Sequence, residues 1–171
     1  NGYVTDGTRT VVRALAGTDG PFRPILDRIA ERESQWPEGR RTNMVSTAEM
    51  VPAAGSVLAL GIADQRKIIE RLFEESCGKL VRLGDEGFSV DGRSYEGPEM
   101  AVLFTCRRAQ VPGSVVTVLY GMSGGAVEKA SQYLFYYGWH SYVIFKNGVV
   151  IRRGLWQEEP ETKEVRIDEA R

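Results

Sequence analysis

The clearest information about the fold lies in residues 115–150, VVTVLYGMSGGAVEKASQYLFYYGWHSYVIFKNGVV. The β-branched run at its start predicts a strand at 115–120, and the glycine-rich turn GMSGG then leads into a helical pattern. Gly138 is expected to end that helix, and a second strand follows at 141–146. One face of the helix collects apolar and small residues, namely Val127, Ala130, Ser131, Leu134 and Phe135.

A strand, a helix and a strand in succession predict a βαβ unit with parallel strands and a right-handed crossover. The pair Asn147-Gly148 predicts a tight turn that joins 142–145 to 149–152 in an antiparallel hairpin. The sequence therefore predicts an α/β fold. The expected fold has a mixed β-sheet with about three covering helices, and it contains a C-terminal βαβ unit followed by a β-hairpin.

Two further helices are expected before this stretch. The first spans about 22–34, with a buried stripe of Phe22, Ile25, Leu26 and Ile29. The second follows a buried strand at 56–61. We expect Asp64 to cap this second helix and Gly78 to close it in a left-handed conformation. Its apolar stripe is Ile68, Ile69, Leu72 and Phe73.

Further strands are expected elsewhere in the chain. An edge strand is expected at 10–14 and a short strand at 44–50, after a polar loop at 36–41. The pair Asp91-Gly92 is a hairpin signal, so the middle of the chain should be antiparallel. Its predicted strands lie at 80–83, 88–90, 93–95 and 100–106.

Composition limits the classes of function. The 171 residues predict one domain spanning 1–171, with a Glu-rich tail from about 157 that frays. The 22 Lys and Arg residues nearly balance the 23 Asp and Glu residues, so no overall field attracts nucleic acid. No apolar run approaches the roughly 20 residues of a membrane span. The first residue is Asn1, which favours a processed protein or a fragment of a longer one.

Cysteine and histidine are scarce. Cys77 and Cys106 allow at most one bridge and lack CxxC spacing, so we expect structural roles; whether they are bridged stays open. One histidine, His140, and two separated cysteines do not supply a typical zinc shell, and HExxH is absent. The sequence predicts neither a metal nor a cofactor.

The strongest enzymatic motif is Gly121-Met122-Ser123-Gly124-Gly125, which matches G-x-S-x-G between a strand and a helix. A triad would need His140 as the base, but the usual order of serine, acid and late histidine is not met. We favour a Ser123 that caps the helix by accepting from the N–H of Gly125 or Ala126, with glycines that permit a tight turn. A serine hydrolase using Ser123 and His140 is the alternative. Anion binding by the N–H groups near Gly121, Gly124 and Gly125 is a third possibility.

Aromatic residues gather at the end of the same helix. Tyr136 and Tyr137 step around the helix beyond its inward stripe, and Gly138 stops it before Trp139. The three rings should therefore form a partly exposed patch, with at least one ring outside the core. Such amphipathic rings serve recognition at interfaces, whereas core packing with exposed polar tips is the other interpretation.

The segments that carry a family resemblance lie between Phe88 and Trp156, about two-fifths of the chain. They are Gly87-Phe88, the run at 91–98 (DGRSYEGP), the run at 118–121 (VLYG) and the run at 137–142 (YGWHSY). In these segments the chain resembles the non-catalytic α/β accessory domain of some bacterial exported, thermolysin-like zinc aminopeptidases. The resemblance implies a periplasmic or exported location. It also implies that the zinc ligands of a parent enzyme lie outside these residues.

Taken together, the sequence predicts a non-catalytic accessory or interaction domain. Its expected partner is another domain of the parent protein, or a separate protein or peptide. The expected binding residues are Tyr136, Tyr137 and Trp139, with Gly121, Gly124 and Gly125 of the glycine-rich turn.

Overall fold

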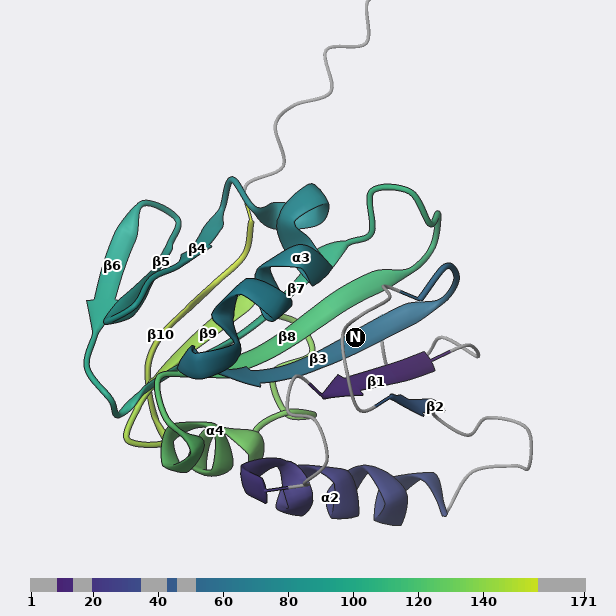
Figure 1. The fold of residues 1–171 in the computed structure, drawn as a ribbon, viewed down its shortest axis with the longest axis horizontal. Helices are drawn as coiled ribbons and strands as arrows, with labels where there is room; N and C mark the ends of the chain where they lie inside the picture. Colours follow the sequence, from purple (N-terminus) through teal and green to yellow (C-terminus); the bar gives the residue numbers. More distant parts are fainter. Residues whose placement is uncertain (1–8, 14–19, 35–42, 46–51, 157–171) are drawn as a thin grey trace, which may run out of the picture.

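A computed structural model describes residues 9–13, 20–34, 43–45 and 52–156 (Figure 1). Its main element is a seven-stranded sheet with the order β10-β9-β7-β8-β3-β1-β2. The strands are β1 (Arg9–Arg13), β2 (Asn43–Val45), β3 (Ser56–Ile62), β7 (Met100–Arg107), β8 (Val115–Gly121), β9 (Tyr142–Lys146) and β10 (Val149–Gly154). The four strands β2, β1, β3 and β8 are parallel, whereas β7, β9 and β10 each pair in antiparallel fashion.

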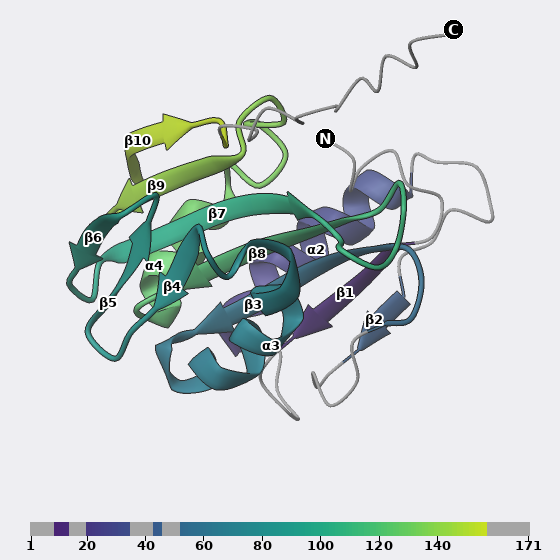
Figure 2. The same cartoon turned by 90° about the horizontal axis from the view of Figure 1, so that it is seen from above.

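Both faces of this sheet are covered (Figures 1 and 2). The helices α2 (Arg23–Glu33) and α4 (Gly124–Ser131) pack on one face. The opposite face carries α3 (Arg66–Cys77) and a small antiparallel sheet. The strands of that small sheet are β4 (Val81–Leu83), β5 (Gly87–Val90) and β6 (Arg93–Glu96). Coverage on both sides explains why β3 and β8 are buried almost continuously rather than at alternate residues.

The α/β fold class is confirmed: three α-helices cover a mixed sheet in the described part of the chain. The strands β8 and β9 run in the same direction, as predicted, but β7 lies between them and pairs with both. Both predicted hairpin turns are confirmed. Asp91 and Asn147 have φ of 51° and 52°, and each is followed by a glycine with positive φ, Gly92 and Gly148.

Several local predictions are wrong. The strand at 9–13 is not an edge strand, because β2 pairs along its outer side. Asp64 makes no capping bond: it lies in a 3₁₀ turn, η2 (Ala63–Gln65), and α3 begins after Gln65 without a side-chain cap. Gly78 ends α3 as predicted, but with φ of −61°, in the right-handed region.

The third helix is shorter than its apolar pattern predicts. It ends at Ser131 instead of continuing to Gly138. The N–H groups of Tyr133 and Leu134 bond to the carbonyls of Ala130 and Ser131, three residues back, so the chain tightens into successive turns. Leu134 is still buried, which explains why the pattern looked helical. The predicted loop at 36–41, most of the strand at 44–50 and the tail at 157–171 lie outside the described residues.

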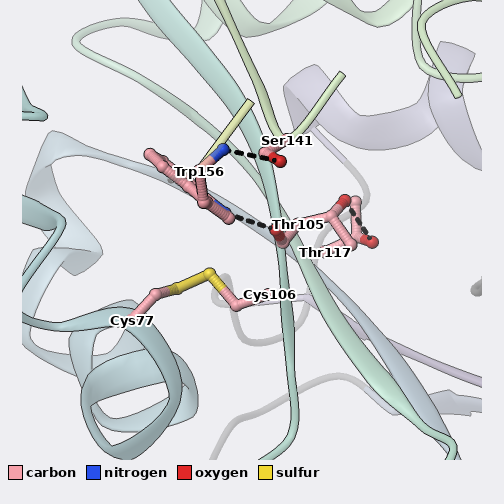
Figure 3. Close-up of a disulfide and its surroundings, with 6 residues drawn as sticks. All are labelled: Cys77, Thr105, Cys106, Thr117, Ser141 and Trp156. Atoms are coloured by element: carbon pink, nitrogen blue, oxygen red, sulfur yellow. Dashed lines mark hydrogen bonds between the residues drawn. A yellow bond between two sulfur atoms is a disulfide. The ribbon is translucent and has the colours of Figure 1, made fainter. Parts of the chain in front are cut away.

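A disulfide joins Cys77 at the end of α3 to Cys106 on β7, and this settles the question left open by the sequence (Figure 3). Both cysteines are buried, in agreement with a structural role. Close by, the indole N–H of Trp156 donates to the carbonyl of Thr105, and its backbone N–H donates to the hydroxyl of Ser141. The disulfide and Trp156 therefore hold α3 and the end of β10 against the same part of β7.

Candidate functional site

The aromatic surface, which we define as Tyr136, Tyr137 and Trp139, lies just beyond the end of α4. The side chain of Trp139 is 91% exposed and that of Tyr136 is 74% exposed, whereas Tyr137 is half-buried. The predicted partial exposure of these rings is confirmed. The inward positions of the helix and of the turns after it are filled by other residues, among them Val127, Ala130 and Leu134, which leaves Trp139 outside the core.

Ring contacts attach the aromatic surface to the core. Tyr133 stacks on the buried Phe145 of β9, with ring centroids 5.7 Å apart and planes 15° apart. Tyr137 packs edge-on against Tyr136 at 5.0 Å and against His140 at 5.7 Å. The cluster is thus anchored at Tyr133, while Trp139 has no ring partner among the described residues. Its exposed ring is therefore available to a partner.

A cavity of about 220 Å³ opens beside the aromatic surface, on the α2 and α4 face of the sheet. Tyr137, Trp139 and His140 form its walls on one side, and Thr105 and Thr117 face it from β7 and β8. The Nδ1 atom of His140 is buried and has no hydrogen-bond partner in the described part of the protein.

Ser123 is the N-cap of α4, as predicted. Its Oγ accepts from the N–H of Ala126 at 3.2 Å and donates to the carbonyl of Pro98 at 2.7 Å. The first bond lies within the turn, and the second joins the turn to the segment before β7. The N–H of Val127 also bonds inside the turn, to the carbonyl of Ser123, which reduces the donors left for an anion.

Ser123 and His140 lie at opposite ends of the sheet. The strands β8 and β9 run in the same direction, and Ser123 comes after the end of β8 whereas His140 precedes the start of β9. Gly121 is level with Phe145, the fourth residue of β9, so the two side chains are separated by roughly 15 Å along the strands. Direct proton transfer between them is impossible at that separation.

A fluorophosphonate probe should therefore leave Ser123 unlabelled. An unactivated serine is a weak nucleophile, and no histidine is near enough to deprotonate this one. Intact-protein mass spectrometry after incubation with the probe measures this, with a known serine hydrolase as the positive control. Stoichiometric labelling that disappears in Ser123→Ala would show that the alternative reading as a hydrolase is right.

The three glycines of the turn have different surroundings. A Cβ on Gly121 would lie 2.6 Å from Val127 Cγ2 and 3.0 Å from the backbone N of Val127. A Cβ on Gly124 would lie 3.0 Å from Pro21, whereas one on Gly125 would meet nothing within 4 Å. The turn therefore needs glycine at position 121 for close packing of α4 on β8, and no ligand is required to explain that residue.

Sequence reasoning did not identify Thr105, Thr117 or Arg153 as neighbours of the aromatic surface. The guanidinium of Arg153 lies 5.8 Å from the centroid of the Tyr137 ring. The hydroxyls of Thr105 and Thr117 are 2.9 Å apart (Figure 3). These residues come from three separate strands, and only the pairing of those strands brings them together, so no local pattern carried the signal.

Two other buried polar atoms without a partner lie near the opposite end of the sheet. They are the Oε1 of Gln65 and the hydroxyl of Tyr120, as far as the described residues show. Tyr120 is fully buried, and this burial raises the pKa of its hydroxyl to about 12. It therefore stays protonated at neutral pH and does not act as a base.

Within the ranges that the structure describes, no group of three or more His, Cys, Asp or Glu side chains could hold a metal ion. The helices of the same ranges are too short or too polar to cross a membrane.

Comparison with known proteins adds no relative. A scan against protein-family models finds no match to the chain, and a search among curated proteins finds none similar to it. The resemblance to a peptidase accessory domain therefore stays a prediction.

Proposed function

We propose that this chain is a non-catalytic interaction domain that binds a protein or peptide partner through the aromatic surface. The observation that carries the proposal is the 91% exposure of Trp139 next to a Tyr136 that is 74% exposed. Exposed rings of this kind gain little from folding, whereas Trp and Tyr supply much of the binding energy at interfaces. A catalytic role has weaker support, because Ser123 and His140 lie far apart.

The setting of this domain is part of the proposal. We propose that it is an accessory module of a larger exported protein of the peptidase kind, as the resemblance implies. The disulfide between Cys77 and Cys106 supports an exported protein, since disulfides persist in oxidising compartments and are rare in the cytosol. The partner is then another part of the same protein or a separate polypeptide.

Trp139→Ala should weaken partner binding about thirtyfold. Truncation of a good aromatic anchor costs about 2 kcal/mol or more, and each 1.4 kcal/mol is a factor of ten in affinity. Peptides would be selected from a displayed random library against the whole chain, and their affinities measured by calorimetry. Val149→Ala is the matched control, because Val149 is an apolar side chain, 65% exposed, on β10.

The result is interpretable because both substitutions are on the surface and should leave the fold intact, which circular dichroism verifies. Binders that lose affinity with Trp139→Ala but keep it with Val149→Ala support the aromatic surface as an interface. If neither Trp139→Ala nor Tyr136→Ala changes the affinity of any selected binder, the aromatic surface is not the binding site.

A further inference from the structure

The cavity beside His140 is lined by two threonine hydroxyls, and the protein itself leaves one of their hydrogens unused. His140 lines this cavity, but its buried Nδ1 atom, which has no hydrogen-bond partner among the described residues, is closed off from a water-sized probe. The hydroxyls of Thr105 and Thr117 share one hydrogen bond, which uses one of their two hydrogens. The other hydrogen belongs to whichever hydroxyl accepts, either on the half-buried Thr105 or on Thr117, which is 3% exposed, and no described residue accepts it. A bound group that accepts hydrogen bonds would therefore be favoured here.

The charges around the cavity favour an anion. No Asp or Glu side chain is among the residues that line it. Arg153 lies beside one of its walls, over the ring of Tyr137, and none of the described carboxylates pairs with this guanidinium. A cation would therefore meet the charge of Arg153 without a compensating acid. A carboxylate would be attracted to the same place.

The shape of the site adds an apolar contact. The cavity of about 220 Å³ has room for much more than one water molecule. Trp139 is one of its lining residues, yet its ring is almost fully exposed. A ligand that fills the cavity with a polar group would therefore have an aromatic platform at the mouth for a neighbouring apolar group.

We infer that this cavity is the anchor site for an acidic side chain, Asp or Glu, of the partner polypeptide. The carboxylate accepts from the free threonine hydroxyl hydrogen. Arg153 supplies the attracting charge, and the partner's adjacent apolar residue packs on Trp139. This inference rests on the proposed function and names the chemistry that the partner must have.

The test uses the fact that His140 is the only histidine of the chain, so imidazole resonances report on this site alone. The probes are acetyl-Leu-Glu-amide and its neutral match, acetyl-Leu-Gln-amide, each titrated into the whole domain by NMR. We expect the Glu peptide to shift the His140 resonances to saturation, with an affinity at least about tenfold above that of the Gln peptide. Sodium acetate, as a third arm, shows whether a free carboxylate binds without the peptide.

Substitution of Arg153 sharpens the test. Arg153→Gln should lower the affinity for the Glu peptide about tenfold and leave the affinity for the Gln peptide unchanged. Arg93→Gln, at an exposed arginine on β6, is the matched control and should change neither affinity. The inference is overturned if both peptides bind equally, if neither moves the His140 resonances, or if acetate alone binds as well as the Glu peptide.

The inference and the proposed function can fail separately. A binder from the displayed library that needs Trp139, contains no acidic residue and leaves His140 unshifted would overturn the carboxylate site. That result would keep the aromatic surface as an interface. Binding of the Glu peptide at His140 that is unaffected by Trp139→Ala would instead keep the carboxylate site and remove the ring from the interface.

Discussion

Replacing both cysteines, Cys77→Ala together with Cys106→Ala, is expected to lower the free energy of unfolding by about 3–4 kcal/mol. The disulfide closes a loop with a sequence separation of 29 residues. Cross-linking a loop of this length removes about 3.6 kcal/mol of chain entropy from the unfolded state in the loop-closure account. For a domain of this size the melting temperature should fall by roughly 10 °C.

Urea unfolding followed by circular dichroism measures this effect. The oxidised protein, the protein refolded with reductant and the double variant should be compared, with free thiols counted by mass spectrometry. The reduced protein should unfold close to the double variant, and reductant should leave the double variant unchanged. An oxidised protein that is no more stable than the reduced one would show that the link between α3 and β7 adds nothing to stability.

The second large effect is expected from Gly121→Ala, with a loss of about 2–3 kcal/mol in the free energy of unfolding. The new methyl group would meet Val127 Cγ2 at 2.6 Å, and the backbone N of Val127 and O of Ser123 at 3.0 and 3.1 Å. A side chain can move away, but these backbone atoms belong to the turn that begins α4. The turn would have to shift, and overpacking of a core typically costs about 1–3 kcal/mol.

Gly125→Ala, four residues along the same turn, is the matched control. Nothing lies within 4 Å of a Cβ at this position, and the residue is helical, so alanine should stabilise the protein by up to about 1 kcal/mol. Urea midpoints of the two variants should therefore move in opposite directions. Equal midpoints for Gly121→Ala and the unchanged protein would show that the turn has room, and would reopen a ligand-binding reason for the glycine.

How far the site could be predicted differs from residue to residue. The capping bond of Ser123 was predictable, because it depends on residues three apart in the sequence. The exposure of Trp139 was also predictable, because other residues of the helical pattern already occupy the face that points to the core. The cavity was not, because its walls come from β7, β8 and the segments on either side of Gly138, which only the tertiary structure brings together.

The sequence by itself determined the elements whose causes are local. Asp91-Gly92 and Asn147-Gly148 require positive φ and produce tight hairpins, and apolar periodicity places α2 and α3. Only the tertiary structure decided that β7 lies between β8 and β9, and that β2 covers the outer side of β1. It also decided that Cys77 meets Cys106, and that Arg153 meets Tyr137. These outcomes depend on which strands pair, and the paired strands are far apart in the sequence. The free energy of that pairing is the sum of many weak contacts, so no short segment of the sequence contains it.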